Sequence, residues 1–352
     1  KVGLYHDALA KAESEWGPIE TWDKRESKLI AIRLYMNLGG DRKSDALLLR
    51  LWREEKNCSD LLTRMLFYKL NKLGPILANE FVKEAESIIL SVDKHKSDLL
   101  GFKSIIQRIF NNYSKAESLI DEAIVIEPSD SWLTSLKIQL LNEQNELVEA
   151  KEQAEKHFDA YPSPYNLRCL SNILTKVDGV SASIALYELH INKYQSANVW
   201  LEYALLLAGN HDWPKCKHAI EQFEKARIIK DKRDEQFLLA WKGQIAINEQ
   251  EIDKAIEILS AHKSTYWKIV TENLKNSKGV LNRKVLDVPF LKQEHMTCAP
   301  TTLAALCSYW GQTFDSKDIA DAICFDGTPA TKERQWLRDN NFSFLEFELE
   351  SE

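Results

Sequence analysis

A spacing of residues that recurs 34 positions later constrains the fold of this chain more than any other feature. A small residue at i, a large one at i+4 and a small one at i+7 are followed at i+12 by a proline that ends a helical run. The two clearest copies are Ala116, Ile120, Ala123 and Pro128, and then Ala150, Ala154, His157 and Pro162. Because i, i+4 and i+7 share one helix face and a fixed period indicates stacked units, the pattern predicts an array of helix pairs.

Weaker copies extend this pattern along most of the chain. They are anchored at residues 8, 46, 78, 182, 216 and 255, so the anchors lie about 35 residues apart on average. A small residue on each helix of a pair lets the two backbones approach, while large residues fill the gaps between pairs. Glycine (12) and proline (9) are scarce in the 352 residues, which agrees with long helices and few turns.

The spacing resembles the tetratricopeptide repeat (TPR), from residue 1 to about 262. A helical solenoid of another helix-pair family is the alternative. Either architecture implies a superhelix whose concave surface binds a peptide or another protein. Asn198, Leu201 and Leu205 are candidates for lining this surface, although the two leucines also suit a plain packing role.

Composition excludes several classes of protein. The formal charge of −7 argues against a mainly electrostatic nucleic-acid binder, and no run of about 18 apolar residues occurs that would span a membrane. The six scattered cysteines indicate neither a metal site nor a disulfide framework, nor is a cofactor indicated, and they favour a reducing compartment such as the cytoplasm. Since the chain starts at Lys1 without Met and Tyr5–Ala8 already reads as helix, we expect a fragment whose compartment stays open.

The pattern changes near residue 280. We expect a solenoid over 1–262, a capping helix and linker over 263–283, and the opening of a mixed α/β domain over 284–352. Residues 285–290 are β-branched and end near a proline, as in a strand, and residues 345–350 alternate apolar with glutamate, as in a half-buried strand. Between them a helix carries Leu303, Leu306, Cys307 and Trp310 on one stripe.

The most informative chemistry lies at the start of this helix. Cys298 stands immediately before it, Pro300 occupies its first turn, and Gln293 precedes the cysteine by five residues. The positive end of a helix dipole favours the thiolate, which is the nucleophilic form of cysteine. A carboxamide upstream can donate a hydrogen bond to an oxyanion, alongside the Cys298 backbone N–H. Nucleophile and oxyanion donor make half of a cysteine-peptidase site.

This segment resembles the double-glycine leader peptidases, the papain-like family that includes the processing domains of bacteriocin exporters. The matching stretches are Val288-Pro289-Phe290, Gln293, Cys298-Ala299-Pro300 and Tyr309-Trp310-Gly311. The resemblance covers about 285–350 and implies that Cys298 is the nucleophile and Gln293 the oxyanion-hole donor.

Two departures bear on activity. Ala299 replaces the family's glycine, and no histidine follows Cys298 to serve as general base. Truncation of the domain and loss of the base in a pseudo-enzyme are the two alternatives, and both predict no peptidase activity for this chain. His295, between Gln293 and Cys298, is the nearest histidine that can approach the thiol. A cysteine at a helix start is also often a core residue.

The sequence therefore predicts a mostly α protein in which a TPR-like superhelix holds a peptide or protein for an incomplete papain-like cysteine peptidase domain. A non-enzymatic adaptor is the alternative, and acyl transfer in place of hydrolysis is a third possibility.

Overall fold

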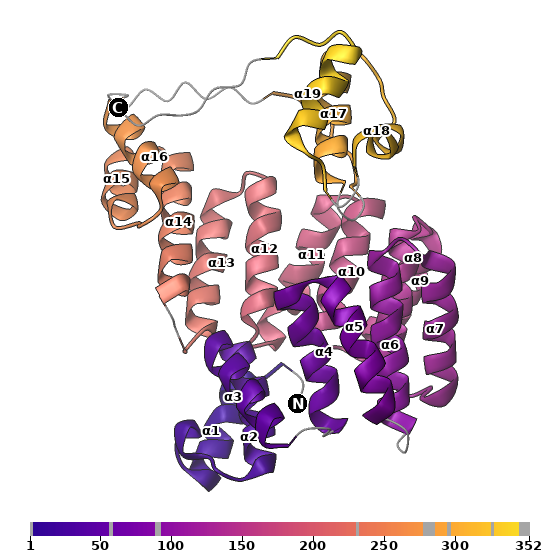
Figure 1. Ribbon diagram of the computed structural model, residues 1–352. Helices are drawn as coiled ribbons and strands as arrows, with labels where there is room; N and C mark the ends of the chain where they lie inside the picture. The colour runs from indigo at the N-terminus through magenta and orange to yellow at the C-terminus, as the bar shows by residue number, and fades with distance from the viewer. Residues whose placement is uncertain are drawn as a thin grey trace. The chain divides into compact units, whose positions relative to one another are not determined.

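The computed structural model describes residues 3–55, 59–88, 93–229, 232–276, 286–293, 297–324 and 327–344 (Figure 1). The chain separates into two compact units. Unit 1 comprises Lys1–Arg108 and Asn112–Gly279, and unit 2 comprises Val280–Glu352 with Ile109–Asn111. Every regular element in the described residues is a helix, and none of these helices is long and apolar enough to cross a bilayer.

Unit 1 consists of helix pairs that follow one another along the chain. A leading helix α1 (Tyr5–Trp16) and a short 3-10 turn η1 (Ile19–Thr21) precede them. The pairs are α2 (Arg25–Leu38) with α3 (Asp41–Glu54), α4 (Ser59–Leu73) with α5 (Pro75–Ile88), α6 (Asp93–Ile109) with α7 (Tyr113–Ile126), α8 (Ser131–Glu143) with α9 (Leu147–Ala160), α10 (Pro164–Val177) with α11 (Val180–His190), α12 (Ala197–Gly209) with α13 (Trp213–Ala226), and α14 (Lys232–Asn248) with α15 (Ile252–Ser260). A second 3-10 turn η2 (Ile191–Lys193) follows α11, and α16 (Thr265–Asn276) follows the last pair.

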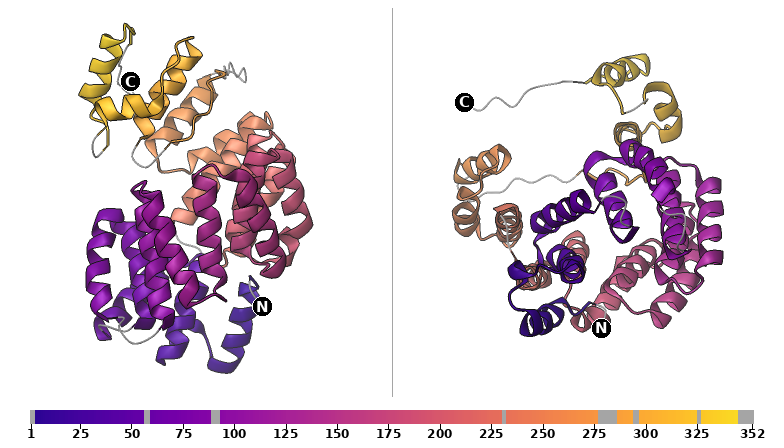
Figure 2. Two further views of the ribbon diagram at one scale, coloured as in Figure 1. Left: turned by 90° about the vertical axis from the view of Figure 1, so that its right-hand side faces the viewer. Right: turned by 60° about the horizontal axis from the view of Figure 1, so that its bottom comes forward.

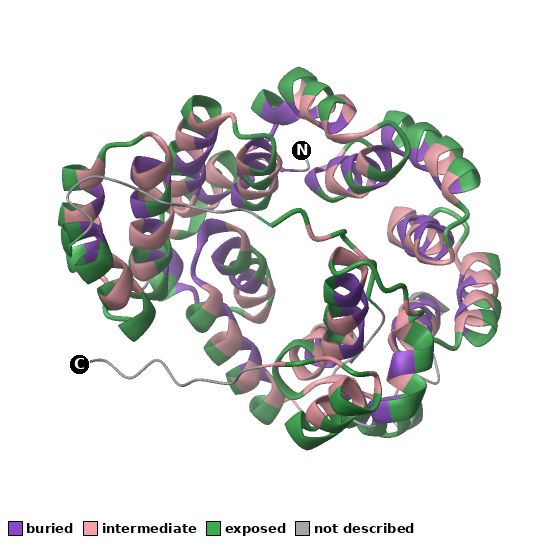
Figure 3. Cartoon of the chain, turned by 90° about the horizontal axis from the view of Figure 1, so that it is seen from above, coloured by how far each residue is buried: buried purple, intermediate pink, exposed green. Residues whose placement is uncertain are grey.

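The residues of the recurring spacing are the ones that bring the helices together. Ala116, Ala123 and Ala150 are fully buried, as predicted, and burial is concentrated between the helices (Figure 3). The fit at Gly243 is so close that a Cβ there would lie 2.3 Å from Leu259 Cδ2 on the paired helix. Backbones this near leave no room for larger residues, which explains the small side chains at these positions.

The first helices of unit 1 also pack against its later repeats. Ile229 N donates to Leu38 O at 2.9 Å, although the two residues are 191 positions apart in the chain. The backbone N–H of His6 donates to the Gln195 side chain at 3.0 Å. The indigo α2 and α3 accordingly lie beside α13 and α14 in Figures 1 and 2. The solenoid therefore completes a turn and contacts itself.

Unit 2 contains α17 (Cys298–Tyr309), α18 (Ser316–Ile323) and α19 (Ala330–Asp339). Its small core joins Ala304, Ile319 and Ile323 with partly buried residues that include Phe314 and Trp336, whose rings meet edge to face at 5.0 Å. These contacts hold the three helices together.

The sequence expectations for unit 2 need correction. Residues 286–290 form no strand, and Phe290 is 94% exposed, because no neighbouring strand among the described residues pairs with this backbone. The strand predicted over 345–350 lies outside the described residues, so a partial α/β segment is not what the described part contains. The predicted stripe on α17 is also wrong in part, since Trp310 is 72% exposed and the core takes Ala304 and Cys307.

Candidate functional site

Cys298 is the first residue of α17, and its side chain is exposed. Helical periodicity explains this, because Cys298 shares the exposed face of α17 with Thr302 and Leu306, while Pro300 and Thr301 turn inward. Among the described cysteines it is the exposed one, whereas Cys307 is buried and burial raises the pKa of that thiol. Cys298 therefore has the accessibility that a nucleophile needs.

Gln293, the predicted oxyanion donor, is exposed in an irregular stretch before α17. Residues 294–296, which include His295, lie outside the described residues. Pairing of the Gln293 carboxamide with the Cys298 thiol therefore stays a prediction. The helix itself ends as the sequence suggests, with Gly311 in a left-handed conformation (φ 83°) directly after Trp310.

A polar pocket of about 260 Å³ lies in unit 1, and we call it the inner pocket. The helices α8, α10 and α12, each the first of its pair, supply its walls. Its lining residues are Gln139, Asn142, Glu143, Tyr165, Arg168, Cys169, Asn172 and Glu202.

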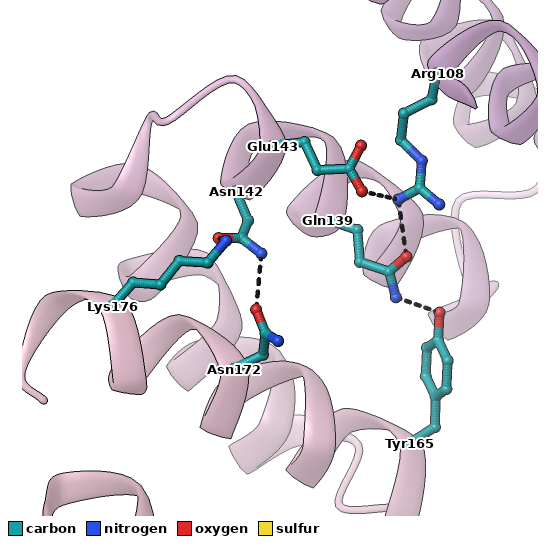
Figure 4. A network of polar contacts seen from close by, with 7 residues as sticks. All are labelled: Arg108, Gln139, Asn142, Glu143, Tyr165, Asn172 and Lys176. Atoms are coloured by element: carbon teal, nitrogen blue, oxygen red, sulfur yellow. Dashed lines mark hydrogen bonds and ion pairs between the residues drawn. The ribbon is translucent and has the colours of Figure 1, made fainter. Parts of the chain in front are cut away.

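A ladder of side chains from successive repeats crosses the inner pocket (Figure 4). Lys176 Nζ donates to Asn142 Oδ1 at 2.7 Å, and these two residues are 34 positions apart. Asn142 Nδ2 in turn donates to Asn172 Oδ1 at 3.2 Å. Because the repeats stack in register, equivalent positions of neighbouring repeats meet, and polar residues there form a continuous row.

Arg108 belongs to a second set of polar contacts, with Gln139, Glu143 and Tyr165 (Figure 4). Its Nη1 donates to Gln139 Oε1 at 3.0 Å and lies 3.3 Å from a carboxylate oxygen of Glu143. Gln139 Nε2 then donates to the Tyr165 hydroxyl at 2.5 Å. Burial raises the pKa of Tyr165, so the phenol stays neutral at physiological pH.

Arg168 and Glu202 form the other charged pair, again 34 positions apart. Arg168 Nε donates to Glu202 Oε1 at 2.6 Å, and the Tyr187 hydroxyl donates to Glu202 Oε2 at 3.1 Å. Burial alone would lower the pKa of Arg168, but the hydrogen bond and charge of Glu202 outweigh it and raise that pKa. Both charges are therefore retained inside the inner pocket.

Cys169 contributes a thiol to the inner pocket but not a reactive one. Burial raises its pKa to about 11, so the thiolate is scarce near neutral pH. The inner pocket thus offers amides, hydroxyls and paired charges, which suit recognition more than catalysis.

Comparison with known proteins identifies both parts of the chain. Residues 285–346 match the Peptidase_C39 like family. The crystal structure of yeast Tom70 aligns with a TM-score of 0.51 and 17% sequence identity over 78% of this chain and 59% of that chain. The structure of PilW, a type IV pilus biogenesis factor, aligns with a TM-score of 0.45 and 14% identity over 60% of this chain and 97% of that one. A thermophilic TPR protein of Thermus thermophilus aligns with a TM-score of 0.37 and 12% identity over 51% and 99%.

The likeness in fold to Tom70 agrees with the helix pairs and their 34-residue spacing. Unit 1 has a TPR-like solenoid fold. The segment that follows it is similar to the C39-like family, as the motif around Cys298 suggests. A search of curated proteins finds no match to this chain.

The residues predicted to line the groove of the TPR solenoid are not among those that line the inner pocket. Asn198 and Leu205 are exposed on α12, and Leu201 packs partly against the core. The inner pocket instead takes Glu202 from this helix. Polar residues that recur 34 positions apart, such as Asn142 with Lys176 or Arg168 with Glu202, could have predicted the inner pocket. Patterns within a single helix do not contain this information.

Proposed function

We propose that the TPR solenoid holds an extended segment of a partner protein in the inner pocket for a papain-like cysteine peptidase domain that includes residues 284–352. Residues 263–283 act as the capping helix and linker between the two parts. The observation that supports binding is the row of amide side chains in the inner pocket, together with the ion pairs of Glu143 with Arg108 and of Glu202 with Arg168.

The amides of this row match the polar pattern of a peptide main chain. Asn142 and Asn172 each carry a donor and an acceptor, as every peptide unit does, and they bond mainly to each other and to Lys176. An entering peptide can exchange these bonds for its own without leaving a buried polar group unpaired. Recognition then depends on backbone conformation, and the pairs at Arg108 and Arg168 select polar neighbouring side chains.

Selection of binders from a displayed random-peptide library, with the whole chain as bait, tests this proposal. The affinity of enriched peptides is measured by calorimetry for the native chain and for Asn142→Ala and Asn172→Ala. We expect about tenfold weaker binding for each variant, since each loses one or two hydrogen bonds to the peptide. The control is Asn37→Ala, which removes a half-buried amide side chain on α2. Unchanged affinity in both pocket variants contradicts the proposal.

The proposed peptidase chemistry starts at Cys298. Its thiolate attacks the carbonyl carbon of the scissile peptide, so that a C–S bond forms and the oxyanion accepts hydrogen bonds from the Gln293 carboxamide and a backbone N–H. The C–N bond then breaks, the leaving amine takes up a proton, and water hydrolyses the thioester. The exposed position of Cys298 at a helix start and the C39-like match over 285–346 support this assignment.

A peptidyl vinyl sulfone, which alkylates activated cysteines, tests the assignment on the full-length protein. Labelling at Cys298 that disappears in Cys298→Ala and weakens in Gln293→Ala is the expected result. Cys324→Ala, which removes a half-buried cysteine of the same unit, serves as the control. Labelling that persists without Cys298 excludes it as the nucleophile.

The absence of a histidine after Cys298 in this sequence favours a second candidate, a non-enzymatic TPR adaptor with a pseudo-peptidase segment. Peptide binding that depends on Asn142, together with no labelling of Cys298 in the full-length protein, would select the adaptor.

A further inference from the structure

A second pocket lies at the beginning of unit 1, on different helices from the inner pocket. It measures about 610 Å³ and is lined by α2, by α3 and by the connection from α1 to α2. Apolar side chains form its walls: Ile19, Trp22, Ala31, Tyr35, Leu47 and Leu49. We call it the outer pocket. Its size is that of pockets that enclose a small ligand or a few residues of a peptide.

Two arginines stand on the rim of the outer pocket. Arg50 and Arg53 are exposed, lie three residues apart on α3 and both line the opening. Neither forms an ion pair or hydrogen bond with any residue that the structure describes. In a chain with a formal charge of −7, two unpaired cations beside an apolar pocket stand out as a site for an anionic partner.

Three acids of this region pair with other cations. Glu20, which also lines the outer pocket, lies 3.0 Å from Lys43 Nζ, and Lys43 holds the pKa of that carboxyl below its ordinary value. Glu55 pairs with Arg25 at 2.8 Å, and Asp45 pairs with Lys72 at 2.9 Å. Arg50 and Arg53 therefore keep their charge available to an incoming carboxylate.

The spacing of the arginines selects the form of that partner. Side chains three apart on a helix begin about 5–6 Å from each other. In an extended peptide, residues i and i+2 point the same way and lie about 6.6 Å apart. Two carboxylates separated by one residue thus match Arg50 and Arg53, and arginine binds each carboxylate through a two-pronged hydrogen bond. The pocket-facing side of α3 from Lys43 to Arg53 is about 15 Å long, enough for four or five extended residues.

We propose that the outer pocket binds an extended acidic peptide segment, with two carboxylates at alternate positions and a neighbouring aromatic or aliphatic side chain inserted against Trp22 and Tyr35. This site does not depend on the proposed function, since it shares no residue with the inner pocket or with the segment around Cys298. It adds a second docking point at the helices of the first repeat.

Fluorescence anisotropy with one defined probe tests the proposal on the whole chain. The probe is a fluorescein-labelled, C-terminally amidated Glu-Ser-Glu-Ser-Phe-Leu peptide, and its partner probe carries Gln in place of both Glu. We expect salt-sensitive binding of the acidic probe, about tenfold weaker binding for Arg50→Gln and for Arg53→Gln, and no binding of the Gln probe. Both arginines are exposed, so the variants keep the fold, which circular dichroism verifies.

Two control variants distinguish binding at the outer pocket from binding elsewhere on the chain. Lys11→Gln removes an exposed cation of α1 outside the pocket, and Asn142→Ala alters the inner pocket. Both leave the affinity unchanged if the proposal holds. Absence of binding, equal loss in Lys11→Gln, or loss in Asn142→Ala overturns it. Binding of phosphatidylserine vesicles that requires Arg50 and Arg53, without binding of the peptide, also overturns it and assigns the cations to a membrane surface.

Discussion

The guanidinium of Arg227 lies 2.6 Å from the carboxylate of Asp234, and both side chains are nearly buried, at 13% and 11% exposure. The same guanidinium lies 2.9 Å from Asp41, which is 186 positions earlier in the chain. Arg227 therefore links the first repeat to the connection between α13 and α14. One side chain joins the two ends of a superhelical turn.

Replacing Arg227 by Ala tests how much this link stabilises the closed turn. Removing one partner leaves the Asp234 carboxylate buried next to Asp41, so we expect the free energy of unfolding to fall by about 3 kcal/mol. The exposed pair of Lys156 and Glu152 is the control, and Lys156→Ala should leave the free energy of unfolding nearly unchanged. Urea titration measures both. A loss in Arg227→Ala no larger than in Lys156→Ala would contradict the role of Arg227.

His157 gives unit 1 a pH dependence. It occupies a position that holds alanine in the preceding repeat, and its Nε2 lies 3.1 Å from the Ser135 hydroxyl. Burial lowers the pKa of His157 below 6.5, although a hydrogen bond to the backbone carbonyl of Ser131 opposes this shift. The unfolded chain therefore binds a proton more readily, and stability falls as the pH drops below about 6.5.

We expect His157→Ala to flatten the loss of stability between pH 7 and pH 5. In this variant the Ser135 hydroxyl keeps Ser131 O and Asn166 as hydrogen-bond partners, so it is not left buried without a partner. Urea midpoints at several pH values measure the effect. His218→Ala, which removes an exposed histidine, is the comparison and should keep the full pH slope.

The sequence predicted the helix pairs because their determinants are local. Ala116 and Ala150 pack against the helix that a short turn joins to their own. The spacing of small residues in the sequence is therefore enough to predict this packing. The inner pocket depends on the stacking of whole repeats, which brings Asn142 beside Lys176. The pattern of α12 by itself therefore favoured Asn198, Leu201 and Leu205 instead of Glu202.

Contacts between residues far apart in the chain could not be predicted from sequence patterns. The contact of Leu38 with Ile229 arises from small rotations accumulated over several repeats, which no local motif encodes. Residues 286–290 have β-branched character, but a strand needs a partner backbone, and the described residues supply none. Cys298 was predictable because both its exposure and its place at a helix start follow from the helix pattern.

Close packing inside a pair predicts the effect of Gly243→Ala. The added Cβ would meet Leu259 Cδ2 at 2.3 Å and Cγ at 2.4 Å, and Leu259 is fully buried. We expect a loss of about 1–3 kcal/mol from overpacking, which outweighs the helix propensity that alanine adds. The double variant with Leu259→Ala tests the cause, because it should show a favourable coupling energy between the two sites in a thermodynamic cycle. If the losses of the two single variants simply add in the double variant, the destabilisation by Gly243→Ala does not come from contact with Leu259.

The proposed chemistry predicts a difference between amide and ester substrates for this chain. A peptide amine leaves only after it gains a proton, and no histidine follows Cys298 to deliver one, so peptide cleavage should be undetectable. A p-nitrophenyl ester has a leaving group that departs as an anion, so thiolate attack alone suffices. We expect a burst of p-nitrophenol that matches the amount of protein, is lost in Cys298→Ala and is retained in Cys324→Ala. Peptide cleavage that disappears in Cys298→Ala would instead assign a proton donor to His295, since it is the nearest histidine in the sequence.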